Sequence, residues 1–143
     1  MQQAESIRKL GLSRVDEIIR FAHGAGYKRI GIANCMRFRR EADLVAERLI
    51  ASGFEVSKVH CKYGLIPASE LIDDAHGTIC NPAGQAAYLA EQNTEINVVM
   101  GLCLGHDMVF AAHSSAPSTT LNIKDRRFGD SPLQGINEAL PTP

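Results

Sequence analysis

Residues 96–102 read INVVMGL, and this stretch decides the fold. It is short, nearly continuous in large apolar residues, and flanked by polar residues on its amino side. A run of this kind is typical of a strand that is buried on both faces. Strands buried on both faces occur in parallel sheets that helices cover. INVVMGL therefore predicts a strand inside a parallel sheet.

Three further short runs predict strands, and helical patterns separate them. The further strands are expected at 29–34 (RIGIAN), 55–60 (EVSKVH) and 119–123 (TTLNI). One helix is expected to begin at Ser13 as its N-cap, with Asp16 in the capping-box position, and to end at Gly24 or Gly26. A second helix is expected to carry apolar residues from Ala42 to Ile50 and to stop at Gly53. A third helix is expected from Asn81-Pro82 to about Gln92, and a fourth from Gly105 to about His113.

Strands that alternate with helices need crossover connections, and these favour parallel strands. The sequence predicts a single-domain α/β fold: a doubly wound, mostly parallel sheet of about four or five strands with helices on both faces. The domain is expected to span residues 1–143, with a core over 13–132 and an irregular tail over 133–143. The stretch 62–78 is the least regular, with at most one helical turn expected in SELIDD (69–74).

The composition narrows the class of protein. A chain of 143 residues fits one domain. Its 15 Lys and Arg balance 16 Asp and Glu, which argues against non-specific nucleic-acid binding. No apolar run approaches a membrane span, and the amino terminus lacks the long apolar stretch of a signal peptide. We therefore expect a cytoplasmic protein without nucleic-acid or membrane partners. The composition does not decide whether the protein is a monomer or an oligomer.

The cysteines fall where a parallel sheet binds its ligands, beyond the carboxyl ends of the strands. Cys35, Cys61 and Cys103 follow three of the predicted strands, and Cys80 directly precedes the helix that starts at Asn81. The four residues are therefore expected at one edge of the sheet. Helix amino termini there would favour thiolate over thiol. Each cysteine alone is at least as consistent with core packing, and the chain has no CxxC pair.

Several thiolates at one edge suit a soft metal. An iron–sulfur cluster is the favoured cofactor, as 4Fe-4S, because Cys thiolates hold such clusters; zinc is the alternative. Lys124 and Arg126 lie just past a predicted strand end and are expected to add positive charge beside the cofactor, although a surface charge run is the commoner role. Asn81 and Gln85 are further candidates for cofactor binding, although Asn81 is equally consistent with a helix cap.

His106 and Asp107 are the candidates for proton transfer. They begin a predicted helix beside Cys103, so they could move a proton, ligate a metal, or simply cap the helix. Lys62 follows Cys61 and is the third candidate catalytic residue. Motifs of phosphate-binding loops, of serine hydrolases and of zinc peptidases are absent from the sequence.

Five motifs together resemble one known family. They are IGIANCxxxxxEA at 30–42, HCKYG at 60–64, CNPxxQA at 80–86, GLCLGHD at 101–107 and APSTTLNIKDR at 116–126. They resemble an uncharacterised prokaryotic metal-binding family, domain of unknown function 1847, over about residues 13–132. The resemblance implies that the four cysteines, His106, Asp107 and the run Lys124-Asp125-Arg126 occupy recurring family positions.

The sequence departs from that family in two ways. Judged by the resemblance, many family members carry an additional Cys-rich segment at the amino terminus. This sequence lacks that segment, which could be the source of the metal-binding description. The family also tends to have paired cysteines where this chain has His60-Cys61, and GHNP where this chain has residues 129–132. The resemblance therefore implies the site and leaves the reaction open.

Three functional hypotheses follow. The first is an iron–sulfur protein that either exchanges electrons with a partner or, with an open iron, acts on a small sulfur-containing substrate. The second is a metal-free thiol enzyme with a cysteine nucleophile and His106 as base. The third is a zinc-binding module without catalysis.

Overall fold

The computed structural model describes residues 2–8 and 10–136, and the structural statements below concern this part of the chain. Its centre is a four-stranded, fully parallel sheet in the order β2-β1-β3-β4. The strands are β1 (Arg29–Asn34), β2 (Glu55–His60), β3 (Ile96–Met100) and β4 (Ser118–Asn122). The helices are α1 (Gln2–Arg8), α2 (Arg14–Ala25), α3 (Arg39–Ala51), α4 (Pro82–Glu91), α5 (Leu104–His113) and α6 (Leu133–Ile136), with 3-10 turns at Met36–Phe38 and Ala68–Glu70. The predicted α/β class is confirmed.

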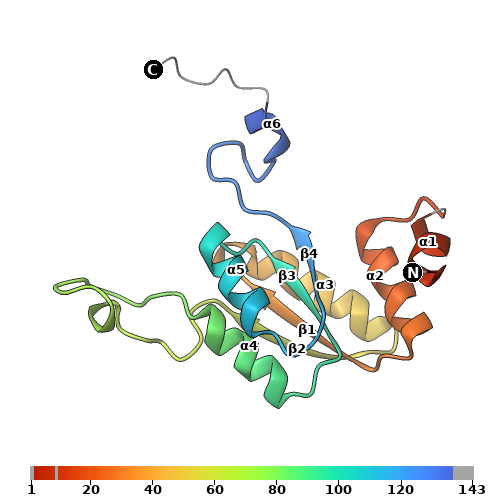
Figure 1. Cartoon of the computed structure of the whole chain (residues 1–143), viewed down its shortest axis with the longest axis horizontal. Coiled ribbons are helices and arrows are strands. Elements are labelled where there is room, and N and C mark those ends of the chain that lie inside the picture. The colour runs from red at the N-terminus through yellow and green to blue at the C-terminus, as the bar shows by residue number, and fades with distance from the viewer. Residues whose placement is uncertain (1, 9, 137–143) are drawn as a thin grey trace.

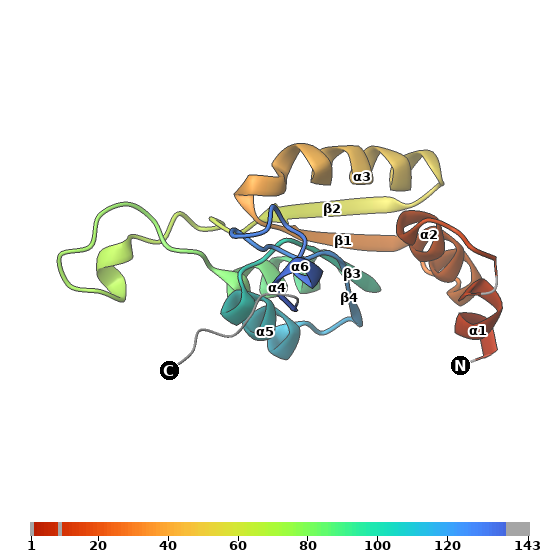
Figure 2. The same ribbon diagram turned by 90° about the horizontal axis from the view of Figure 1, so that it is seen from above.

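Helices cover both faces of the sheet, as Figure 2 shows for α3 on one side and for α4 and α5 on the other. Ile30 and Ile32 of β1 point to the first face, where they pack with residues of α2 and α3 such as Ala22 and Leu49. Ala33 of β1 points to the second face and packs with residues of α4 and α5. Burying apolar side chains on both faces is what fixes a strand as central.

The burial of each strand follows its place in the sheet. β3 is buried along its whole length and β1 along all but its first residue, since both are central. The edge strands β2 and β4 keep most of their residues half-exposed. The strand predicted from INVVMGL is confirmed over Ile96–Met100, and its burial follows from its central place in the sheet.

The helix ends follow capping rules. Ser13 caps α2: its hydroxyl accepts a hydrogen bond from the Asp16 backbone N–H, and Gly26 ends the helix in the left-handed conformation, with φ 75°. Asn81 caps α4 by accepting from the Gly84 N–H at 2.8 Å. Both helix starts had been predicted from the same residues.

Element boundaries differ from the sequence-based expectation at several points. β3 ends at Met100 because Gly101 turns the chain with φ 61°, and a side chain at Gly101 would overlap the Phe38 ring. The helical turn in the 62–78 stretch is displaced to Ala68–Glu70, and a 3-10 turn precedes α3. Two helices, α1 and α6, were not predicted.

Helix α6 corrects the expected irregular tail over 133–136, since residues Leu133–Ile136 are helical there. The remainder of that tail, residues 137–143, lies outside the described residues. None of the described helices is long and apolar enough to cross a membrane.

Candidate cysteine site

The hydrogen-bond ladder of the sheet continues past the strand ends and brings three of the cysteines together. The Cys35 N–H donates to the Met100 carbonyl at 3.0 Å, and the Cys61 N–H donates to the Asn34 carbonyl at 2.9 Å. The Cys61 carbonyl then accepts from the Asn81 N–H at 2.7 Å, which places the neighbouring Cys80 beside Cys61. These backbone bonds are why residues far apart in sequence meet at the carboxyl edge.

The four sulfurs form two close associations. The Cys80 Sγ lies 3.7 Å from the Cys61 Sγ. The Lys124 Nζ lies 2.7 Å from the Cys35 Sγ and 3.5 Å from the Cys103 Sγ, so one ammonium group bridges the other two cysteines. Cys35 and Cys61 also influence each other's pKa, so the two associations are neighbours. We call these five residues the cysteine site.

The charge of Lys124 decides the ionisation of Cys35. Burial by itself raises the pKa of the Cys35 thiol, since Cys35 is only 8% exposed. Hydrogen bonds from Lys124 and from the Arg37 N–H, together with the Lys124 charge, outweigh the burial and lower this pKa below its ordinary value of 9.0. For Lys124, burial lowers the pKa, but the contacts with Cys35 and Cys103 outweigh that effect and raise it. The pair therefore favours a thiolate beside an ammonium.

The surroundings of Cys61 shift the pKa of its thiol in the opposite direction. The pKa of Cys61 is raised to about 11. Burial is the largest cause and the neighbours Cys80 and Cys35 add to it, whereas the Met36 N–H, which donates to the Cys61 sulfur, opposes them. Cys61 is 3% exposed. At neutral pH the site thus contains a thiolate-prone Cys35 next to a thiol at Cys61.

A clamp in the chain after β4 holds Lys124 in place. The Arg37 guanidinium forms an ion pair with Asp130 at 2.9 Å. Asp130 also accepts from the Asp125 N–H at 3.1 Å, and the Asp130 N–H donates to the Asp125 carbonyl at 2.7 Å. Because Arg37 sits two residues after Cys35, the clamp ties the segment beginning at Lys124 to the segment beginning at Cys35. Sequence analysis missed this clamp, because the two residues are 93 positions apart.

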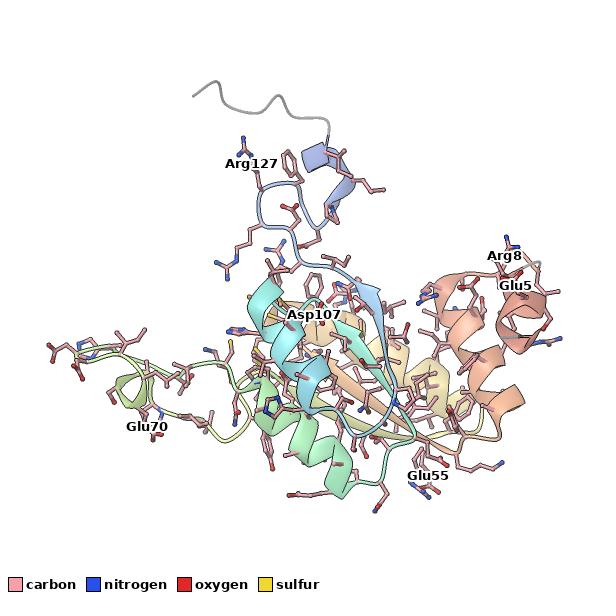
Figure 3. The ribbon with its side chains drawn as sticks, viewed as in Figure 1. Glu5, Arg8, Glu55, Glu70, Asp107 and Arg127 are labelled. Atoms are coloured by element: carbon pink, nitrogen blue, oxygen red, sulfur yellow. The ribbon has the colours of Figure 1, made fainter. Side chains whose placement is uncertain are left out.

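The three candidate catalytic residues lie around the site rather than within it. His106 and Asp107 are half-buried in the first turn of α5, directly after Cys103, and Figure 3 labels Asp107 there. Burial raises the pKa of the Asp107 carboxyl above its ordinary 3.8. The Lys62 ammonium donates to the Thr78 carbonyl, so it bridges the two ends of the loop between β2 and α4.

The other candidate binding residues have structural partners. Besides capping α4, Asn81 donates to the Tyr63 carbonyl at 3.3 Å. Gln85 is fully buried and donates to the carbonyls of Val59, at 3.0 Å, and Asn34, at 3.3 Å, so it closes the gap between α4 and the ends of β1 and β2. Arg126 is exposed after β4.

The chemistry of the cysteine site fits a soft metal, but its present geometry is not a coordination sphere. In residues 2–8 and 10–136, no group of three or more His, Cys, Asp and Glu side chains stands in an arrangement that could hold a metal ion. The four thiols are all free. Rotation about one torsion relocates a cysteine sulfur without moving the backbone.

Fold and site together define the class: a small α/β protein that gathers four free cysteines and one lysine at the carboxyl edge of a parallel sheet. A family model matches residues 1–121, and its description is a protein of unknown function, DUF1847. The chain belongs to this family.

An uncharacterised protein of Methanocaldococcus jannaschii is 39% identical to this chain over 119 residues. The match covers 80% of this chain and 61% of the archaeal protein. A solved structure, of a mutant N-acetyl-L-ornithine transcarbamylase complexed with carbamyl phosphate and N-succinyl-L-norvaline, has a TM-score of 0.41 and 17% identity, covering 85% of this chain and 37% of that one. That likeness is too distant to inform function.

Proposed function

We propose that the cysteine site binds a soft metal centre, with an iron–sulfur cluster of the 4Fe-4S type as the favoured occupant. The observation that carries the proposal is the meeting of all four cysteines of the chain at one edge, from three strand ends and one helix start. Cys35, Cys61 and Cys80 also take part in core packing, but core packing does not require a lysine between two cysteines. Cys thiolates are the ligands that such clusters use.

With Cys35, Cys61, Cys80 and Cys103 all as ligands, the cluster would supply electron transfer. With three of them as ligands, one iron would stay open to bind a small sulfur-containing molecule. Lys124 balances negative charge at the site, and the backbone N–H groups of Met36 and Arg37 donate to the sulfurs of Cys61 and Cys35. His106 and Asp107 would exchange a proton with a bound substrate. A cytoplasmic protein with a small-molecule substrate or an electron-transfer partner is the corresponding proposal at the cellular level.

The test is the iron, sulfide and zinc content of protein that is expressed and purified without oxygen. We expect brown protein with iron and sulfide in equal amounts, near four of each per chain. Each of the four Cys→Ser variants should lose most of the iron, whereas His113→Gln, at the far end of α5, should keep it. Colourless protein with stoichiometric zinc would indicate a zinc site in place of the cluster. Protein free of both metals would overturn the proposal.

A metal-free thiol enzyme is the second candidate, and the contact between Lys124 and Cys35 favours it. A buried thiol held as thiolate by a neighbouring ammonium is an activated nucleophile. The sequence favoured His106 as the base, while the cation that touches a cysteine is Lys124. Alkylation of metal-free, reduced protein distinguishes the cysteines: we expect Cys35 to react faster than Cys61 at neutral pH. Equal rates at the two residues would remove the support for this candidate.

A further inference from the structure

Two segments project from the body of the molecule beside the cysteine site. The first is the loop of residues 62–79, between β2 and α4, and the second is the tail of residues 125–136, after β4. Figure 1 shows the loop running outward past α4 and the tail leaving in another direction, beyond α5. Most side chains of the loop are exposed, although Ala68 is buried, and those of the tail are exposed or half-buried.

The loop ends in an apolar and acidic tip. Leu71 and Ile72 are 74% and 64% exposed, and Asp73 and Asp74 follow them directly and are exposed as well. Glu70 adds a third acidic side chain on the amino side. Large apolar side chains that are this exposed and lie next to one another are typical of a contact surface.

The tail carries two acidic residues, Asp125 and Asp130, which belong to the clamp, and two arginines outside it. Arg126 and Arg127 are exposed and basic, and Leu133 and Ile136 of α6 are 72% and 75% exposed. Figure 3 shows Glu70 on the loop and Arg127 on the tail, on separate projections that point away from each other. The acidic loop tip and the basic tail of one chain therefore do not cover one another.

We propose that a second copy of this chain covers both segments, with the loop of each copy against the tail of the other. A two-fold arrangement makes the contact twice, because the same surface of each copy then meets itself. Asp73 and Asp74 would face Arg126 and Arg127, and the exposed leucine and isoleucine side chains of loop and tail would pack together. Opposite charges give such an interface its orientation, and apolar burial gives it affinity.

This interface adjoins the cysteine site but does not depend on what the cysteines bind. The loop is anchored at Cys61 and Cys80, and the tail follows Lys124. The dimer would thus form around the edge that carries the site. Its existence and the metal content of the protein are separate measurements, so either proposal can fail alone.

The test is the molar mass of the full chain in solution, measured by light scattering under reducing conditions so that no disulfide links the copies. We expect the wild type to be a dimer that weakens as salt is raised. The variants Asp73→Lys/Asp74→Lys and Arg126→Glu/Arg127→Glu should each be monomeric, because loop and tail then carry the same sign. An equal mixture of these two variants should be dimeric again, since the reversed loop of one meets the reversed tail of the other.

Matched controls separate the interface from general surface effects. Leu71→Ser/Ile72→Ser should weaken the dimer, whereas Leu44→Ser/Ile50→Ser, at similarly exposed positions on α3, should leave it unchanged. Circular dichroism checks that each variant is folded. A wild type that stays monomeric, or folded charge variants whose mixture gains no dimer over the separate variants, would overturn the proposal.

Discussion

Lys124 is the residue on which the ionisation of the cysteine site depends. Replacing it with Met removes the charge and the hydrogen bonds that lower the pKa of Cys35, while burial, which raises that pKa, remains. We expect alkylation of Cys35 in metal-free Lys124→Met protein to slow at neutral pH, because the pKa of Cys35 rises and less of it is thiolate. Lys62→Met is the matched control and should have no such effect, because Lys62 bonds to the Thr78 carbonyl. An unchanged rate in Lys124→Met would mean that Lys124 does not hold the thiolate.

Cys61 gives the second prediction at the scale of a residue. The pKa of its thiol is raised from 9.0 to about 11, so the folded state holds this proton more tightly than the unfolded chain does. The stabilisation is complete below pH 9.0 and is lost as the pH rises toward about 11. We expect metal-free protein to lose about 2–3 kcal/mol of its free energy of unfolding over this window, from two pKa units.

Denaturant titrations of metal-free protein at several alkaline pH values measure this loss. Cys61→Ala should show a shallower loss than the wild type. Parallel pH profiles for Cys61→Ala and the wild type would contradict the assignment to Cys61.

Helix α4 begins just after Cys80 of the cysteine site, and the residue that caps this helix gives a prediction at the scale of an element. Asn81 accepts from the Gly84 N–H, and Gly84 has no room for a side chain because Asn81 packs against it. We expect Asn81→Ala to lower the free energy of unfolding by about 1 kcal/mol, the usual cost of a lost cap. Asn81→Asp should recover most of that loss, since a carboxylate oxygen also accepts this bond. Equal destabilisation by both substitutions would show that Asn81 contributes something other than its cap.

The sequence predicted which helices and strands are present better than it predicted where each of them begins and ends. Ser13 and Asn81 mark their helix starts correctly because a cap is a local bond between neighbours. The predicted end of β3 was two residues too late, because the chain turns at Gly101, where the Phe38 ring of another segment leaves no room for a side chain. Contacts of that kind leave no periodic signal in the chain.

For the whole molecule, the proposed metal centre predicts a link between occupancy and stability. A group that binds the folded chain and not the unfolded one raises the midpoint of thermal unfolding. We expect removal of the bound metal to lower that temperature by several degrees and reconstitution to restore it. The Cys80→Ser variant should unfold at the temperature of metal-free wild type whether or not metal is added. Identical unfolding temperatures before and after metal removal would argue against a metal centre built from these four residues.

The sequence alone determined that this is a parallel α/β sheet with four cysteines at its carboxyl edge. Both conclusions rest on local patterns: apolar runs that must be buried, and a chain direction that all parallel strands share. The tertiary structure decided which groups touch, namely Cys61 with Cys80, and Lys124 with Cys35 and Cys103. Those contacts depend on how the chain returns after β4, and the pairing of Arg37 with Asp130 fixes that return. A charge pair across 93 positions is a property of the folded chain. No periodicity or spacing encodes it.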